Sequence, residues 1–467
     1  MQASEMLERA ERRRSRKIEA AKKQAAVSRT ETEAQEQDKL LFIGGFAFLA
    51  MVLSAPYTII SNTSDFSGEG SIWRQVGYLV ALILSIVAAV RHGGGAKALA
   101  MPWPMLLALG WCWLSLAWAL NDGVAVRRVV LTTVVIWNMF ILVQAAGYER
   151  SLFMLRVAFV AQLVLCYAAV FIDPATGIHT LIETGEGSKI LGNWRGIMGH
   201  KNVAGAACAI TAMLFLFDAK KIKPAIRIAV IAAALYFLWR SQSKTSGGMI
   251  AIATLCGWIF QKYDQRIRTF AIPIIMILTA LAWFLGSTYK TVVMDSLFDP
   301  KFFTGRGQIW LGLLNYSADH PILGTGFGSF WNIGTGSPIY EYGQAWVRGI
   351  AQGHNGYLDL LVTIGIPGVL LVVFATIVWP IWRLLVSRIQ PSRGAVAVAL
   401  LVFGMGHNIT ESSLFERDTL IGIVMMVGVA IAQNWEQMGT KARRGTMDIF
   451  AALAERRREA REDRARA

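Results

Sequence analysis

Apolar runs separated by short polar connections fill most of the chain. Runs close to the ~20 residues needed to cross a bilayer lie at about 40–61, 72–90, 102–119, 126–146, 152–172, 202–217, 225–240, 245–260, 269–287, 356–382, 394–408 and 419–435. The residues before and after these runs are instead rich in charge. The pattern predicts an all-α polytopic membrane protein with about twelve transmembrane helices between two charged tails.

The loops between the runs differ in charge, and this difference predicts the orientation of the chain. An even number of spans places both tails on the same side. If that side is cytoplasmic, the inner loops carry 12 Lys and Arg in 42 residues, a much higher density than the outer loops carry. The contrast follows the positive-inside rule. It predicts cytoplasmic tails at 1–39 and 436–467 around a twelve-span domain at 40–435, with no cleavable signal peptide.

Composition excludes several classes of protein. The chain is 54% hydrophobic and 16% charged, against about 25% charged residues in an average soluble protein, which excludes an ordinary water-soluble enzyme. The net charge of +15 lies in short loops and tails rather than on one folded face. Anionic lipid and phosphate are therefore the expected partners, and no nucleic acid is expected. The four cysteines lie in apolar segments without metal-ligand spacing, so we expect free thiols and no metal.

Two long loops fall on the outer side, at about 173–201 and 288–354. The second is rich in Gly, Trp, Phe and Tyr, and this aromatic content argues against disorder. Apolar residues four positions apart, such as Ile309 and Leu313, predict an amphipathic helix that begins at Arg306 and ends near residue 319. We expect residues 288–354 to form a folded cap on the membrane domain.

The outer side also carries cations for which the orientation rule offers no role. They cluster at span ends, and the set comprises Arg127, Arg128, Arg195, His200, Lys201, Arg240, Lys244, Arg306 and Arg348. If the loops converge, these residues would line a cavity at the outer leaflet. Diphosphate suits such a cavity, because Arg makes bidentate phosphate contacts and helix N-termini add amide donors. A single cation of this kind more often contacts lipid headgroups, so the prediction rests on the cluster.

His354 lies where the second long loop enters the span at 356–382, within Gln352-Gly353-His354-Asn355-Gly356-Tyr357-Leu358-Asp359. The positive end of that helix disfavours protonation and helps to keep the imidazole neutral and able to accept a proton. A lone histidine at an interface is more often structural, but the motif and the neighbouring Arg348 favour a catalytic base. Weaker candidates are Asp359 one turn inside the span, and His407, Asn408 and Glu411 at the outer end of another span.

At these motifs the sequence resembles the O-antigen ligase and Wzy-type polymerase family, over about 40–435. The resemblance is most specific in the motif around His354, in Gly305-Arg306-Gly307-Gln308-Ile309-Trp310, and in Gly324-Thr325-Gly326-Phe327-Gly328. The segments 195–202 and 241–246 are similar to those of exopolysaccharide polymerases. Lys244 stands where the family often has Arg, and this departure weakens a bidentate role because Lys is a point charge.

The resemblance implies a GT-C-like helical bundle with a capping periplasmic loop, in the bacterial inner membrane. It implies polymerisation of undecaprenyl-diphosphate-linked repeat units into exopolysaccharide or O-antigen, by metal-independent inverting transfer without a cofactor. His354 would be the general base, and Arg306, Lys244 and Arg240 would hold the diphosphate. The implied partners are the lipid-linked donor and acceptor glycans, membrane lipids, a chain-length regulator and a flippase.

Three alternatives stay open from the sequence. An O-antigen ligase would use the same donor and transfer the glycan to lipid A core. A twelve-span secondary transporter is suggested by the span count alone, although such proteins commonly show two related halves and no internal repeat is visible here. A glycan- or lipid-binding scaffold would not depend on His354 for polymer synthesis.

Overall fold

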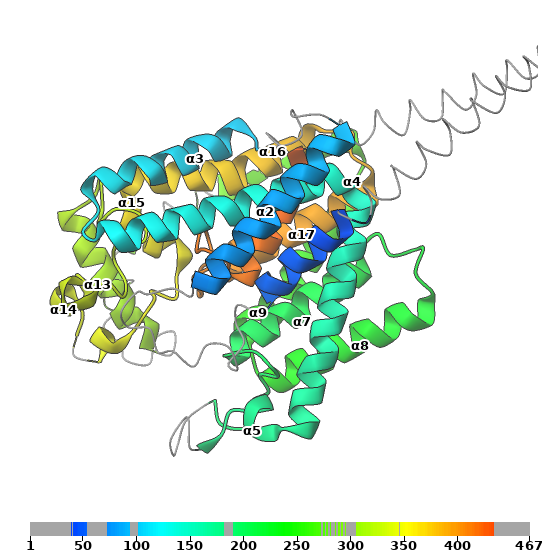
Figure 1. Cartoon of the computed structure of the whole chain (residues 1–467), viewed down its shortest axis with the longest axis horizontal. Helices are drawn as coiled ribbons and strands as arrows, with labels where there is room; N and C mark the ends of the chain where they lie inside the picture. Colours follow the sequence, from blue (N-terminus) through cyan, green and yellow to red (C-terminus); the bar gives the residue numbers. More distant parts are fainter. Residues whose placement is uncertain are drawn as a thin grey trace, which may run out of the picture.

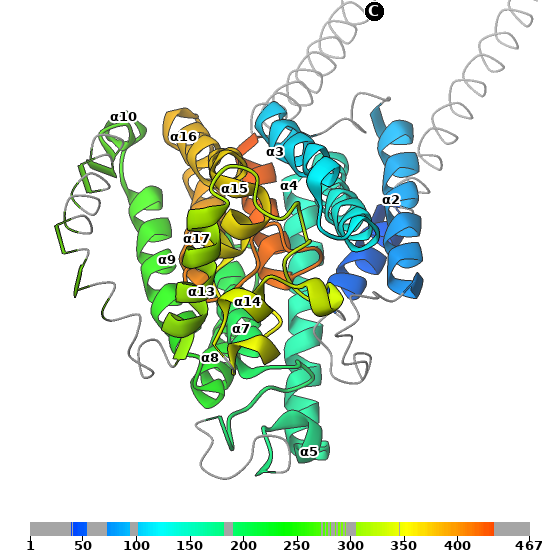
Figure 2. The same ribbon diagram turned by 90° about the vertical axis from the view of Figure 1, so that its left-hand side faces the viewer.

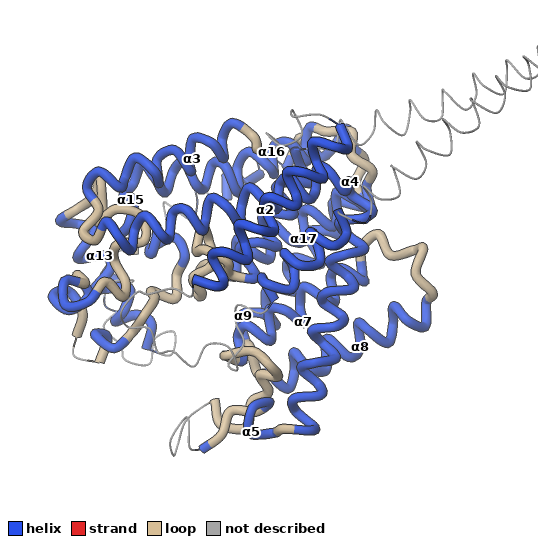
Figure 3. Tube along the Cα trace, viewed as in Figure 1, coloured by secondary structure: helices blue, strands red, loops and turns tan. Residues whose placement is uncertain are grey.

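A computed structural model of the chain describes residues 41–53, 72–93, 101–181, 190–271, 305–344 and 346–433, together with residue 39 and scattered positions between 274 and 295. Within these residues the structure is helical, and Figure 3 shows helices and loops without a strand. The nearest approach to a sheet is an isolated antiparallel bridge between Ile178 and Trp194. The predicted all-α class is confirmed for this part of the chain. The predicted tails and residues 296–304 of the cap lie outside it.

The helices succeed one another with short connections. Their bounds are α2 (Ile72–Gly93), α3 (Trp103–Leu114), α4 (Asp122–Ile172), α5 (Pro174–Gly177), α7 (Lys201–Leu216), α8 (Pro224–Ser241), α9 (Lys244–Lys262), α10 (Gln265–Arg268), α13 (Arg306–Asp319), α14 (Ile339–Tyr342), α15 (Gly356–Val373), α16 (Trp379–Val386) and α17 (Pro391–His407). Short 3₁₀ turns lie at Ser115–Trp118 (η2), Gly334–Gly336 (η4) and Val347–Gly349 (η5), and Phe374–Val378 (η6) is a π-helical segment. Two further apolar helices are Leu41–Leu53 and Leu420–Gln433.

Four helices of the described chain are long and apolar enough to cross a membrane: Arg74–Arg91 within α2, Asp122–Ile172, Pro224–Ser241 and Gly356–Val386. Shorter apolar helices, among them Lys201–Leu216, accompany them. Every predicted apolar segment falls on a described helix except 269–287, which lies largely outside the described residues. These helices are the expected form of a membrane-embedded protein, and the number of twelve crossings stays a prediction.

The helix starts follow local sequence signals. Asn121 caps α4 by accepting a hydrogen bond from the Val124 N–H, 3.1 Å away, as Asn side chains do at N-caps. Proline stands in the first turn of α3, α8 and α17, where its missing N–H has no helical partner to lose. These signals explain why the predicted and observed helix starts agree within a few residues.

Two glycines interrupt the longest helices. Gly147 has φ +74° within α4, so the two spans predicted there follow each other with a change of direction rather than a loop (Figure 1). Gly365 has φ +65° within α15. The backbone groups freed at this break are paired, because the Ile366 N–H donates to Pro321 O and the Ile364 carbonyl accepts from the Trp111 indole. Such pairing makes a broken helix tolerable inside a membrane.

Small residues allow the central helices to pack closely. α17 packs against α9 and α7, and α15 packs against α3 and α13. A Cβ atom at Gly406 of α17 would lie 2.1 Å from the Met249 side chain of α9, so a larger residue there would displace Met249. Small residues are common where membrane helices pack closely. In Figure 2, α9 lies toward one side of the molecule and α2 at the other, with α15 and α17 between them.

The described part of the predicted cap is folded around a small core of its own. α13 begins at Arg306 and ends at Asp319 as predicted. The core comprises Ile309, Trp310, Leu313, Tyr316, Phe330, Trp331, Ile339, Val347 and Val362. Since Val362 belongs to α15, this core also joins the cap to the bundle. Figure 1 places α13 and α14 together at one end of the molecule, so the cap covers the end of the bundle where α15 begins.

Candidate functional site

Four helices begin at residues that the sequence singled out. α7 begins at Lys201, α9 at Lys244 and α13 at Arg306, while His354 immediately precedes the N-cap of α15, Asn355. The Asn355 side chain accepts hydrogen bonds from two N–H groups of α15, each at 3.1 Å. Helix N-termini carry partial positive charge and free N–H groups. Cationic side chains added to these helix ends suit a ligand with several negative charges.

One carboxylate, that of Glu411, joins these helix starts. Its Oε1 atom lies 2.6 Å from an Arg306 NH2 nitrogen and accepts a 2.6 Å hydrogen bond from the Asn202 side-chain amide. Its Oε2 atom lies 3.2 Å from His354 Nδ1. Arg306 also donates to the Thr410 carbonyl. The loop after α17 therefore holds together the starts of α7 and α13 and the residue that precedes α15.

The same loop reaches the fourth helix start. The hydroxyls of Thr245 in α9 and Thr410 lie 2.8 Å apart, and Lys201 Nζ donates to the Gln242 carbonyl at 3.0 Å. Lys201 is also close enough to Lys244 and Arg306 for both charges to act on it. The structure thus places Lys201, Lys244, Arg306 and His354 near one another.

The electrostatics of the site favour an ionised Glu411 and a neutral His200. Burial raises the pKa of Glu411, but the hydrogen bond from His354 and the positive charge of Arg306 outweigh burial and lower this pKa to about 2. Burial lowers the pKa of His200 to about 4, although the charge of Glu411 acts in the opposite direction. His200 is therefore neutral near pH 7, where its Nδ1 accepts a hydrogen bond from the Asn202 N–H.

His354 has a backbone conformation that is uncommon for a residue other than glycine. Its φ is +48°, in the left-handed region, which costs free energy for a residue with a side chain and is often found at functional sites. The conformation turns the imidazole toward Glu411, while the preceding Gly353 N–H points to the Asp359 carboxylate, 3.0 Å from Oδ1. The His354 side chain is 26% exposed. It is therefore both fixed by a partner and open to a ligand.

Asp359 ties together the two loops that carry His354 and Glu411. Besides Gly353, its carboxylate accepts hydrogen bonds from the Ser412 hydroxyl and, at 2.8 Å, from the Trp331 indole. Because Ser412 follows Glu411 directly, this carboxylate restrains the distance between the two reactive side chains. No arginine contacts Asp359 among the described interactions.

The fold uses the other predicted cations in other ways. Arg195 is buried and donates to the Thr176 and Ala175 carbonyls. Arg240 lies 4.9 Å above the Trp194 ring, a cation–π contact. Arg128 is buried and donates to the carbonyls of two residues of the cap. These three side chains stabilise loops and helix ends around the Glu411 cluster.

Two further predicted residues lie apart from the Glu411 cluster. Arg127 donates to the Gly123 carbonyl, one turn earlier on its own helix. Arg348 lies exposed on η5. Both positions are compatible with contacts to lipid headgroups, the ordinary role of a cation at a span end.

From the sequence, Glu411 was only a weak candidate for the site, and Asn202 was not a candidate. Glu411 is four residues after His407, in a short outer loop between two apolar runs. The signal that could have identified Glu411 is that it is an acidic residue in an outer loop, on the side of the chain where many cations lie. Its partners Arg306 and His354 lie 105 and 57 positions away, so no local motif contains the three residues together.

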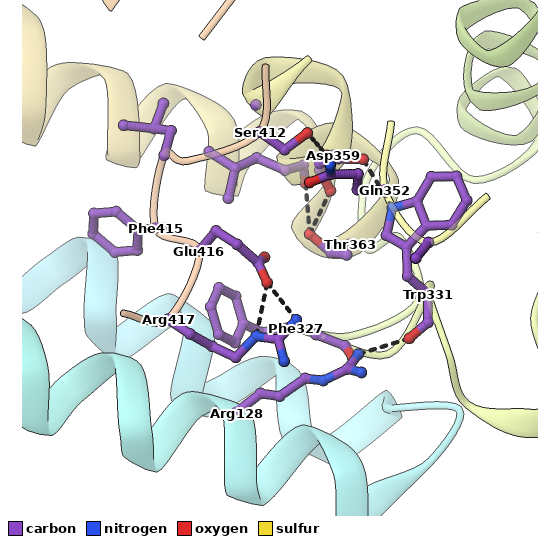
Figure 4. Close-up of a pocket in the computed structure, with 15 residues that line it drawn as sticks. Arg128, Phe327, Trp331, Gln352, Asp359, Thr363, Ser412, Phe415, Glu416 and Arg417 are labelled. Carbon is purple, nitrogen blue, oxygen red and sulfur yellow. Dashed lines mark hydrogen bonds and ion pairs between the residues drawn. The ribbon is translucent and has the colours of Figure 1, made fainter. Parts of the chain in front are cut away.

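A pocket lies beside this cluster, because its lining includes Gln352, two residues before His354, and Ser412, which follows Glu411 (Figure 4). It has an empty volume of about 570 Å³, with its open mouth included. Its lining combines aromatic, acidic and basic side chains: Arg128, Phe327, Trp331, Gln352, Asp359, Thr363, Ser412, Phe415, Glu416 and Arg417, with small or apolar residues between them. Figure 4 shows Glu416 paired with Arg417 across the pocket from Asp359.

Residues with metal-binding side chains are dispersed. In the described chain no three His, Cys, Asp or Glu side chains gather in a way that could hold a metal ion. Cys112, Cys166 and Cys208 are buried free thiols, and Cys256 is a free thiol that is only partly buried. The chemical groups that the site does bring together are an ordered histidine–carboxylate pair and several cations at helix N-termini.

A helical, membrane-embedded protein with this site matches a known family. Residues 203–373 match a family model described as O-antigen ligase, so this part of the chain is similar to the O-antigen ligase and Wzy-type family. The resemblance predicted from the motifs is confirmed. The matched region contains Lys244, Arg306 and His354 but ends before Glu411. No curated protein matches the chain. The match indicates an enzyme of the glycosyl-transfer type, a ligase or polymerase, with lipid-linked glycan substrates.

Proposed function

We propose that this protein polymerises oligosaccharide repeat units carried on undecaprenyl diphosphate, at the periplasmic face of the bacterial inner membrane. The observation that carries the proposal is the convergence of Arg306 and His354 on the two oxygens of Glu411. A base fixed by a carboxylate beside a cluster of cations has the parts needed to move a glycan from a diphosphate to a hydroxyl.

His354 is proposed as the general base. A hydrogen bond from Nδ1–H to Glu411 leaves Nε2 as the acceptor for a proton, and the described contacts give Nε2 no other partner. The acceptor hydroxyl gives its proton to Nε2 while its oxygen forms the new bond to the anomeric carbon. The ionised Glu411 then stabilises the imidazolium, as the aspartate does in a Ser-His-Asp triad.

The cations are proposed to take the charge of the leaving group. As the anomeric carbon separates from the phosphate oxygen, the electron pair of that bond passes to the diphosphate. Arg306, Lys244 and Lys201 stand at three helix N-termini around the site, where side-chain charge and backbone N–H groups act together. A single displacement of this kind inverts the anomeric configuration and requires no metal, because these cations neutralise the diphosphate.

Arg306 has a partner before substrate binds. Its ion pair with Glu411 orients the guanidinium and keeps it near its working position. A bound diphosphate would compete with Glu411 for Arg306 and would leave the carboxylate free to serve His354. Asn202, which contacts the same oxygen as Arg306, would hold Glu411 in place during this exchange.

Polymerase activity is preferred over ligase activity because the segments 195–202 and 241–246 are similar to those of exopolysaccharide polymerases. The description of the matching family model favours a ligase as the second candidate. The two differ in the acceptor, since a polymerase admits a second lipid-linked repeat and a ligase admits a terminal acceptor such as lipid A core.

Deletion of the gene distinguishes these activities. For a polymerase, the deletion strain should accumulate single repeat units on the lipid carrier and lose the long polymer, and the wild-type gene supplied on a plasmid should restore it. Long polymer that stays attached to the carrier would identify a ligase. Lipid-linked repeats confined to the cytoplasmic leaflet would favour the transporter alternative and exclude glycosyl transfer.

A further inference from the structure

The pocket beside the Glu411 cluster is not needed for the chemistry described above. Neither His354 nor Arg306 lines it, yet Gln352 and Ser412, which do, are near neighbours of His354 and Glu411 in the chain. The turn at Gly353 therefore separates the reactive imidazole from a second cavity. A glycan whose hydroxyl reaches His354 could continue across this turn.

The lining of the pocket has the chemistry of a sugar-binding site. Phe327, Trp331 and Phe415 offer flat apolar surfaces, while Gln352 and Glu416 offer hydrogen-bonding groups of both kinds. Ligand sites typically combine an apolar wall with a few well-placed polar groups. Sugars present both C–H faces and hydroxyls, and therefore need this combination.

A buried donor in the pocket lacks a protein partner. Arg128 is 8% exposed, and its NH1 group donates to the Trp331 carbonyl at 2.7 Å. Its Nε atom is buried and has no hydrogen-bond partner among the described residues. A buried, unpaired N–H group costs free energy, and because this atom is shut off from solvent, Arg128 shapes the wall of the pocket rather than offering its Nε–H to a ligand. Figure 4 shows Arg128 at the floor of the pocket, between Trp331 and the Glu416–Arg417 pair.

The position of the pocket distinguishes the acceptor glycan from the donor glycan. Its lining comes from the start of α4, the cap, α15 and the loop after α17, and none of it comes from α7 or α9. Lys201 and Lys244, which are proposed to hold the donor diphosphate, start α7 and α9. The His354–Glu411 pair therefore lies between the donor cations and the pocket.

We infer that this pocket is a binding subsite for the acceptor glycan, in which one sugar residue lies beside Trp331 and bonds to Gln352 and Glu416. The inference rests on the proposed glycosyl transfer, which it extends by naming the side of the site that the acceptor occupies. The mixed charge of the lining suits a neutral sugar, or one with a single acidic substituent, better than a phosphate.

The experiment measures binding separately from transfer. Oligosaccharide fragments of the host's own surface polysaccharide, prepared by partial acid hydrolysis, are titrated by calorimetry into the purified full chain in detergent. Gln352→Ala should weaken binding roughly 3- to 10-fold, as expected for the loss of a neutral hydrogen bond. Glu416→Gln should weaken it by roughly 10-fold or more, because a charged partner is lost. Both should raise the KM for the fragment used as acceptor and leave the KM for the lipid-linked donor unchanged.

The binding experiment has control variants and results that would contradict the acceptor subsite. Gln390→Ala, another exposed glutamine just before a helix, α17, should bind like wild type. His354→Ala should keep wild-type binding and lose transfer. Unchanged fragment binding in both pocket variants, or a rise in donor KM alone, would overturn the acceptor subsite while leaving the transfer function intact. Fragment binding by a wild-type protein that transfers nothing would overturn the proposed function and leave the subsite intact.

Discussion

Arg306 and Glu411 form an ion pair of 2.6 Å although 105 positions separate them in the sequence. The arginine starts α13 in the cap, and the glutamate lies in the loop after α17. The pair therefore fastens the cap to the membrane domain at the place where His354 also binds Glu411. A change at any of these three residues should affect both the chemistry and the docking of the cap.

Replacement of His354 by alanine should abolish polymer synthesis while the protein still inserts into the membrane. Loss of a general base typically costs 10²- to 10⁴-fold in rate. The measurement is polymer yield at matched membrane abundance. His320→Ala is the control, because His320 lies in the same outer loop and stacks on Tyr316 away from Glu411. Near wild-type polymer from the His354 variant would refute the base assignment.

Two substitutions of Arg306 distinguish the role of its charge from the role of its geometry. Arg306→Ala should be inactive, and Arg306→Lys should be strongly impaired, because lysine cannot reproduce the two contacts of the guanidinium with Thr410 and Glu411. Initial rates with purified lipid-linked repeat would measure the effect. Arg388→Lys, an exposed arginine between α16 and α17, should behave as wild type. Full rescue by lysine at position 306 would mean that charge alone matters there.

The lowered pKa of Glu411 predicts that the stability of the folded protein depends on pH. Its pKa falls from the ordinary 4.5 to about 2 in the folded protein, so the folded state favours the carboxylate. The resulting stabilisation, on the order of 3 kcal/mol, is present above about pH 4.5 and is lost as the pH falls toward 2. Glu411→Gln should lower the Tm in detergent near pH 6, and its difference from wild type should shrink below pH 4.5. Glu341→Gln, an exposed glutamate of α14, should show neither effect. A constant difference across this range would contradict the assignment.

Gly365→Ala should destabilise the contact between α15 and the cap. Gly365 has φ +65°, and a Cβ atom there would lie 1.9 Å from the Ile322 carbonyl oxygen. Backbone strain alone costs roughly 1–3 kcal/mol, and the clash would add to it. The expected result is a lower Tm and reduced activity. Gly336→Ala, where a Cβ atom meets nothing within 4 Å, is the control. Wild-type stability of the Gly365 variant would show that the break can straighten without loss.

The orientation of the chain can be tested with fusions. Both tails are predicted to be cytoplasmic and residues 288–354 periplasmic, on the basis of loop charge. Alkaline phosphatase inserted after Gly336 should be active, and green fluorescent protein placed after Ala467 should fluoresce. The opposite pair of results would reverse the orientation and would place the site in the cytoplasm.

Local patterns along the chain were sufficient to predict the helices. Apolar runs, prolines in first turns and asparagine caps act over a few residues, and the structure follows them closely at α4, α8 and α13. The sequence also identified Arg306 and His354, because each lies on a motif at the start of a helix. The helical class and the family were therefore accessible without coordinates.

The tertiary structure decided which charged residues share a site. Arg195, Arg240 and Arg306 look alike in sequence, since each lies at the edge of an apolar run. Packing assigns Arg195 to backbone carbonyls, Arg240 to the Trp194 ring, and Arg306 to Glu411. The short loop after α17 reaches His354 and Arg306 because α17 packs against α9 and α7 and its Met405 carbonyl accepts a hydrogen bond from the Tyr357 hydroxyl of α15. Contacts over such separations depend on the packing of whole helices, whereas caps and periodicity depend on neighbouring residues, and for this reason the sequence alone could not assign Glu411 to the site.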